Sequence, residues 1–177
     1  NGSTWTQEAV LLAPDGAAID KFGYSVAISE NTIVVGAYQD DTTFSNGGSA
    51  YVFIRNGTNW AFQQKLTPGD GAADDEFGNA VGITGEFIVV GSHLANLPGS
   101  SDTGSAYCYF RTGTVWAFTQ KLTPTAGTAG PILGDLFGES VAVSGSRIAI
   151  GAAGDDSPET RAGAVYVYAE NGGGNYI

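Results

Sequence analysis

Two pairs of adjacent aspartates follow equivalent apolar runs of the chain, Asp40–Asp41 and Asp155–Asp156. Carboxylate oxygens are hard ligands, and Ca²⁺ takes roughly six to eight oxygens, so these four residues are calcium candidates. The alternative is that they are solvated turn residues that keep the surface charged. We favour the alternative, because the intervening part of the chain has Asn96 and Asp102 in the corresponding loop. We therefore predict no cofactor, with calcium kept as an open alternative.

Catalytic chemistry has little support in the sequence. His93 is the single histidine, and no serine or cysteine lies beside it in a pattern typical of a nucleophile. The glycines at 172–174 follow an apolar run, but no helix pattern begins after them, so they do not indicate a phosphate-binding loop. We predict that the chain is not an enzyme. A hydrolase that uses acidic loops and a metal is the weakest alternative.

A second set of acidic residues precedes three further apolar runs. Its members recur in step with one another, which favours a structural role such as closing loops through Asx-turns. They are Asp15, Asp20, Asp70, Asp74, Asp75 and Asp135. Two Asn-X-Ser/Thr sequons, at Asn1 and Asn56, allow glycosylation. Each also lies in an Asn-Gly dipeptide, a strong signal for a hairpin turn.

The elements that carry these residues are repeated. The sequence DKFGYSVAISENTIVVGA at 20–37 recurs in similar form at 75–92 and 135–152. The recurring positions are Phe22, Phe77 and Phe137; Gly36, Gly91 and Gly151; and Trp5, Trp60 and Trp116. Their spacing of 55 to 60 residues is typical of a propeller or a solenoid.

Each repeat contains four short runs rich in β-branched and aromatic residues, separated by Gly-rich turns. This pattern predicts an all-β protein made of β-propeller blades with four antiparallel strands each, three repeats per chain. The runs at 24–29, 79–84 and 139–144 are expected to be the inner strands. The phenylalanines are expected to pack between blades, and Cys108 to be a small buried hydrophobe.

The charge narrows the classes of partner. A net charge of −11 argues against binding to nucleic acid or to anionic membranes. No apolar run approaches the roughly 18 residues that a membrane-spanning helix needs, so we expect no membrane insertion. The single cysteine gives no information about redox compartment.

The motif FG.SVA followed by VVGA and AYVF resembles the FG-GAP repeat of integrin α-subunit propellers, and is more similar to the variety found in secreted and surface proteins of microbes. The signature residues here are Phe22–Gly23 with Gly36, Phe77–Gly78 with Gly91, and Phe137–Gly138 with Gly151. The resemblance implies a propeller and an extracellular or cell-surface location. The turns SENT, TGEF and SGSR lack the carboxylates of the integrin calcium loop, so that site is not expected here.

We predict one domain over 1–177, with repeats at about 5–59, 60–115 and 116–171 and a further outer strand starting at 172–177. Three blades cannot close a propeller, which needs about four to eight. An outer strand expected at Trp5–Leu12 is left over at one end. We therefore expect head-to-tail association, in which this strand completes the third blade of a neighbouring subunit, or else a fragment of a longer propeller.

Three functions remain open at this stage. The first is a non-catalytic extracellular interaction or adhesion module whose partner is itself or another protein. The second is a carbohydrate-binding propeller lectin, in which Tyr38 and the three tryptophans would contact glycans. The third is a fragment of a longer adhesion-type protein.

Overall fold

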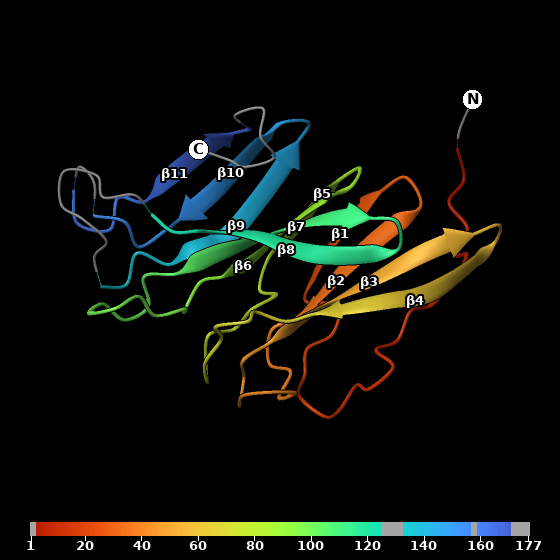
Figure 1. The fold of residues 1–177 in the computed structure, drawn as a ribbon, viewed down its shortest axis with the longest axis horizontal. Coiled ribbons are helices and arrows are strands. Elements are labelled where there is room, and N and C mark those ends of the chain that lie inside the picture. The colour runs from red at the N-terminus through yellow and green to blue at the C-terminus, as the bar shows by residue number, and fades with distance from the viewer. Residues whose placement is uncertain (1–2, 125–132, 157–158, 171–177) are drawn as a thin grey trace.

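The computed structural model describes residues 3–124, 133–156 and 159–170. These residues form three antiparallel β-sheets and no helix (Figure 1). The strands are β1 (Ser25–Ser29), β2 (Thr32–Ala37), β3 (Ser49–Asn56), β4 (Asn59–Leu66), β5 (Val81–Thr84), β6 (Phe87–Ser92), β7 (Ser105–Thr112), β8 (Val115–Leu122), β9 (Phe137–Ser144), β10 (Arg147–Ala152) and β11 (Ala164–Ala169). The prediction of all-β blades in three repeats is confirmed.

The sheets have the same up-and-down order. Sheet one is β1-β2-β3-β4, sheet two is β5-β6-β7-β8, and sheet three contains β9-β10-β11 among the described residues. β5 lies against both β1 and β9, so the first strands of the three sheets are neighbours. The further outer strand expected at 172–177 lies outside the described residues.

Local sequence explains why each blade is a meander. The turn from β3 to β4 contains Gly57 at φ 63°, and the turn from β7 to β8 contains Gly113 at φ 65°, a conformation that glycine adopts without strain. The same two hairpins each have a bulge, after Val52 in sheet one and after Cys108 in sheet two. The repeats are therefore alike down to their register shifts.

The core lies between the sheets. One cluster joins Val34, Ala50 and Val52 of sheet one to Val81 and Ile83 of sheet two. A second cluster joins sheet two to Phe137 and its neighbours in sheet three. Each sheet thus has a leading face, which packs on the preceding sheet, and a trailing face, which packs on the next.

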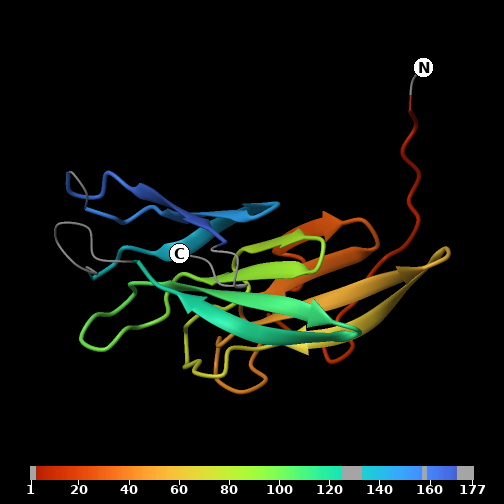
Figure 2. The same cartoon turned by 45° about the horizontal axis from the view of Figure 1, so that its top comes forward.

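The outer strand expected at Trp5–Leu12 is absent from the single chain. The segment has no strand pairing and extends away from the sheets, as the red trace in Figure 2 shows. Trp5 is 97% exposed, Leu11 packs against the cluster around Phe22, and Glu8 forms an ion pair with Arg55 of β3 (2.7 Å). A strand needs an edge to pair with, and none of the described strands pairs with residues 5–12.

No helix among the described residues is long and apolar enough to cross a membrane.

Candidate functional site

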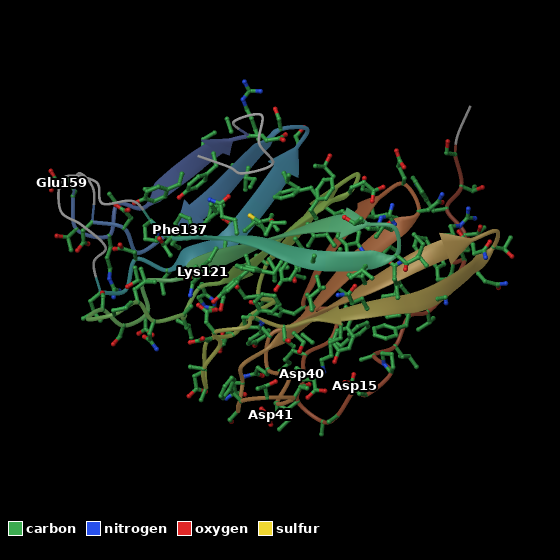
Figure 3. The ribbon with its side chains drawn as sticks, in the orientation of Figure 1. Asp15, Asp40, Asp41, Lys121, Phe137 and Glu159 are labelled. Carbon is green, nitrogen blue, oxygen red and sulfur yellow. The ribbon has the colours of Figure 1, made fainter. Side chains whose placement is uncertain are left out.

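An acidic network lies at the loop end of sheet one, where Asp15, Asp40 and Asp41 gather (Figure 3). The Tyr51 hydroxyl oxygen lies 2.8 Å from Asp15 and 2.5 Å from Asp40, so its one proton is shared between two acceptor carboxylates. Lys65 bridges the same two carboxylates, with its Nζ 2.7 Å from Asp15 and 2.9 Å from Asp40. The two aspartates, 25 residues apart in the sequence, thus share one cation and one hydroxyl.

The electrostatics of this network follow from its contacts. Burial alone would raise the pKa of Asp40, but hydrogen bonds from Thr42, Tyr51 and Lys65 lower it to about 2. Burial and the two adjacent carboxylates raise the pKa of Tyr51, so its hydroxyl keeps its proton and acts as a donor. Lys65 Nζ also lies 5.0 Å from the Tyr51 ring centroid, in a cation–π contact.

The other sheets keep parts of the network. In sheet two, the Tyr107 hydroxyl donates to Asp70 (2.9 Å), and Lys121 pairs with Asp70 (2.7 Å). The position of Asp40 is taken there by the buried Ala95. In sheet three, Tyr166 donates to Asp155 (2.5 Å). These carboxylates therefore tie loops to the third strand of each sheet.

The four predicted calcium candidates occupy structural positions. Asp41 and Asp156 each accept the backbone N–H five residues later, from Asn46 and Arg161, both at 2.7 Å. Asp40 and Asp155 hold tyrosines as described above. Across the described ranges, no group of three or more His, Cys, Asp or Glu side chains is arranged to hold a metal ion.

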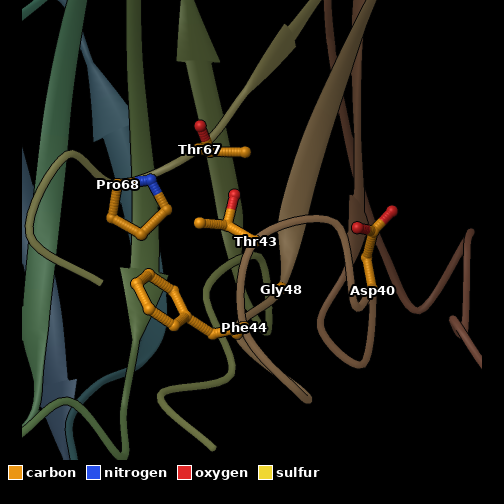
Figure 4. A pocket seen from close by; sticks show the side chains of 7 residues that line it. Asp40, Thr43, Phe44, Gly48, Thr67 and Pro68 are labelled. Atoms are coloured by element: carbon orange, nitrogen blue, oxygen red, sulfur yellow. The ribbon is translucent and has the colours of Figure 1, made fainter. Parts of the chain in front are cut away.

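A cavity beside Asp40 is too small for a ligand. It lies under the β2–β3 loop, between Phe44 and Pro68 (Figure 4). Its volume is about 10 Å³. That is about the room for one water molecule.

Two members of the second acidic set, Asp20 and Asp75, close loops by a different bond from the Asx-turn that was expected. Asp20 accepts the N–H of Ala17 (2.6 Å), and Asp75 accepts that of Ala72 (2.7 Å). The donor lies three residues before each acceptor, whereas an Asx-turn has it two residues after. Burial raises the pKa of Asp75.

The remaining chemical candidates are scattered. His93 Nε2 lies 3.6 Å from Glu76 in sheet two, and burial lowers the pKa of His93. Cys108 is fully buried, which raises the pKa of its thiol to about 12. Asn56 is exposed at the β3–β4 turn, and Asn1 lies outside the described residues.

The aromatic residues considered for glycan binding do not form one repeated site. Trp116 is 2% exposed, and its Nε1 donates to Gln63 of sheet one (2.9 Å). Trp60 packs in the cluster around Phe22. The Tyr38 ring packs against Tyr24 with ring centroids 4.4 Å apart and the ring planes tilted by 57°.

The signature glycines form the junctions between sheets. A Cβ on Gly36 would lie 1.9 Å from the carbonyl oxygen of Gly78, and a Cβ on Gly91 would lie 2.0 Å from that of Gly138. Phe77 and Phe137 are fully buried at these junctions. The Phe-Gly backbone of each sheet thus enters a socket on the sheet before it.

The leading face of sheet one has no such neighbour among the described residues. Val26 and Ile28 are 67% and 64% exposed, whereas the equivalent Val81 and Ile83 of sheet two are 8% and 7% exposed. The apolar groove along this face has a volume of about 570 Å³. Phe22 is half-buried beside the groove, whereas its counterparts Phe77 and Phe137 are fully buried.

The trailing face of sheet three is open in the complementary way, with none of the described residues covering it. Val165 and Val167 are 68% and 67% exposed, whereas the equivalent Ala50 and Val52 of sheet one are fully buried. Sequence reasoning predicted unpaired strand edges but missed these faces. The signal was present, because the terminal repeats have the same apolar alternation as the internal ones.

Comparison with known proteins agrees with this architecture. The family model described as FG-GAP repeat matches residues 5–53, 60–109 and 116–168. Each of the second and third segments begins in the fourth strand of one sheet and continues through the first three strands of the next. No curated protein matches the chain. The three matches cover most of the sequence, and the chain therefore belongs to the FG-GAP repeat family.

Proposed function

We propose that this chain is a non-catalytic, extracellular interaction module that associates with further copies of itself through the two open ends of its blade array. The observation that carries the proposal is that both ends expose apolar faces whose equivalents are buried inside the molecule. A leading face and a trailing face already pack on each other twice within one chain.

The two faces are different surfaces, so the contact is head-to-tail. Such a contact closes into a ring if the rotation between copies permits and otherwise extends into a filament. Two copies would supply six blades, which is within the range of known propellers. Adhesion to another surface protein would use the same faces.

The N-terminal segment contributes to the same interface in this proposal. Its Trp5 and Leu11 have the spacing of Trp60 and Leu66 in β4 and of Trp116 and Leu122 in β8. In sheets one and two these strands pair with β3 and β7. The arm would pair in the same way with β11 of a neighbour.

The test uses one charged substitution on each face. Val26→Glu blocks the leading face and Val167→Glu blocks the trailing face, and both side chains are exposed in the single chain, so folding is retained. Analytical ultracentrifugation should show that the native chain associates and that each variant is monomeric. A mixture of the two variants should give a dimer that grows no further, because each supplies one intact face.

Val115→Glu is the matched control, since Val115 is 57% exposed and lies on β8, away from both end faces. This variant should associate like the native chain. A native chain that stays monomeric at high concentration would overturn the proposal and favour the fragment of a longer propeller. Glycan-array binding by the monomer would instead favour the lectin.

A further inference from the structure

The structure assigns the occupant of a specific pocket on the trailing face of sheet three: the Phe22–Gly23 backbone of a second copy of this chain. The inference rests on the proposed self-association and names the contact that makes it. The pocket has a volume of about 390 Å³. Its lining includes Ser140 of β9, Gly151 of β10 and Gly163 just before β11.

The same socket is filled at both internal junctions. Gly151 is the equivalent of Gly36 and Gly91, where a Cβ would meet the next sheet's carbonyl oxygen at 1.9 and 2.0 Å. At Gly151 a Cβ would meet nothing of another sheet, and its nearest atom is the Oγ of Ser140 in its own sheet. Among the residues that the structure describes, the third socket is therefore built but empty.

A second glycine of each sheet, in the loop between its second and third strands, shows the same difference between filled and empty sockets. Gly48 and Gly104 lie so close to Phe77 and Phe137 that a Cβ would be 2.0 Å from a phenylalanine carbonyl oxygen. At the corresponding Gly163 the nearest atom is 3.5 Å away.

The internal junctions are joined by a short backbone ladder. At each junction, backbone N–H groups of the segment just before the Phe-Gly pair, together with that of the phenylalanine, donate hydrogen bonds to the preceding sheet. The acceptors are carbonyl oxygens in the loop between the second and third strands of that sheet. The bonds at the first junction run from Asp74 to Ser45 (2.8 Å), from Glu76 to Asn46 (3.1 Å) and from Phe77 to Gly47 (3.0 Å). The equivalent bonds at the second junction run from Gly134 to Ser101 (3.1 Å), from Leu136 to Asp102 (3.2 Å) and from Phe137 to Thr103 (2.9 Å).

Both halves of a third ladder are preformed at the ends of the array. The donor segment 19–22 has Ile19 at φ 82° and Lys21 at φ 60°, matching φ 65° and 54° at Asp74 and Glu76. No described residue accepts a hydrogen bond from the N–H groups of Ile19, Lys21 or Phe22. A β-branched residue at positive φ is strained, and such strain is common where a backbone is held ready for a partner.

The acceptor loop has the matching conformation. Arg161 and Gly163 have φ 53° and 77°, close to φ 49° and 81° at Asn46 and Gly48. Ser140 is the equivalent of Ser25, whose hydroxyl donates to the Gly78 carbonyl oxygen across the first junction (2.8 Å). Ser140 is exposed and would donate in the same way to Gly23 of the second copy.

The first test fills the socket with one methyl group. Gly151→Ala should fold normally, because its φ is not in the positive region and the Ser140 hydroxyl can rotate away. Its self-association, measured by analytical ultracentrifugation, should weaken by at least about tenfold, since overpacking a close contact is costly. Gly69→Ala, at an exposed glycine with open space around it, is the matched control and should associate normally.

The second test locates the contact by cross-linking. Asn46 and Asp74 touch across the first junction, with Nδ2 2.8 Å from Oδ1, and their equivalents at the ends are Arg161 and Ile19. A mixture of Ile19→Cys and Arg161→Cys, treated with a short bis-maleimide, should give a covalent dimer with one copy of each. Either variant alone should give little dimer. The native Cys108 is fully buried and should not react.

An Asn46→Cys/Asp74→Cys chain, which should cross-link internally, is the positive control. If the Val26→Glu and Val167→Glu mixture dimerises but Gly151→Ala associates normally and the 19–161 cross-link is absent, the socket assignment is overturned while the proposed association stands. If the native chain does not associate at all, both fail. A dimer of matched ends, 19 to 19 or 161 to 161, would also overturn the assignment.

Discussion

Asp40 shows at the scale of a single residue how a buried charge is held in this fold. It is 3% exposed and accepts hydrogen bonds from a hydroxyl of Thr42, the Tyr51 phenol and the Lys65 ammonium. All three hydrogen bonds stabilise the carboxylate relative to the neutral acid. Together they lower the pKa by more than burial raises it.

We expect Asp40→Asn to lower the free energy of unfolding at pH 7 by about 2 kcal/mol. This figure follows from the pKa of Asp40, which is about 2 in the folded chain and 3.8 for an unperturbed aspartate. Because the folded pKa is depressed, this stabilisation is present above about pH 4 and is lost as the pH falls toward 2. Urea denaturation of both proteins across this range measures the difference.

Asp15→Asn is the matched control, because Asp15 accepts from the same Tyr51 and Lys65 but its side chain is 51% exposed. We expect it to cost less than about 1 kcal/mol, as exposed ion pairs do. Equal effects of the two substitutions would contradict the assignment of Asp40 as the anchor of the network.

At the scale of the elements, contact between neighbouring sheets depends on a glycine in the second strand of each. Gly36→Ala and Gly91→Ala should each destabilise the chain by about 3 kcal/mol, because the added methyl group meets a carbonyl oxygen that belongs to a packed backbone. Gly151→Ala in the monomer should cost well under 1 kcal/mol by the same reasoning. Thermal unfolding at low protein concentration compares the three, and a uniform effect would exclude a role for the junction.

The N-terminal arm offers a spectroscopic prediction at the same scale. Trp5 is 97% exposed in the single chain, whereas the equivalent Trp116 is 2% exposed. If the arm pairs with β11 of a neighbour, tryptophan fluorescence should shift to shorter wavelength as the protein concentration rises. Trp5→Phe should abolish most of that shift, and a shift that persists in this variant would place the change at another tryptophan.

How far the sequence predicts these elements depends on how local each signal is. Strands were predictable from the alternation of apolar and polar residues, and turns from the positions of glycine. The repeat of about 55 to 60 residues predicted a blade of four strands. The shared cation between Asp15 and Asp40 was not, because it depends on two loops that only the folded sheet brings together. The strand expected at Trp5–Leu12 does not form within the described chain, because a strand needs a partner edge; its pairing with the third blade of a neighbour stays a prediction.

At the scale of the whole molecule, both end surfaces follow from one rule. Every sheet has a face for the sheet before it and a face for the sheet after it, and the terminal sheets keep these faces although the described chain leaves them uncovered. The local pattern of a strand does not separate exposed from buried copies, since Val26 and Val81 occupy the same position in their repeats; only the place of the repeat at the end or in the interior of the array does. Their exposures of 67% and 8% arise from neighbours alone.

The offset between repeat and sheet has a consequence for how such arrays change length. Each matched segment from the second onward supplies the last strand of one blade and the first three strands of the next. Copying or deleting one such segment leaves every remaining junction with its full complement of strands. Lengthening by duplication of a matched segment therefore needs no repair at the splice points.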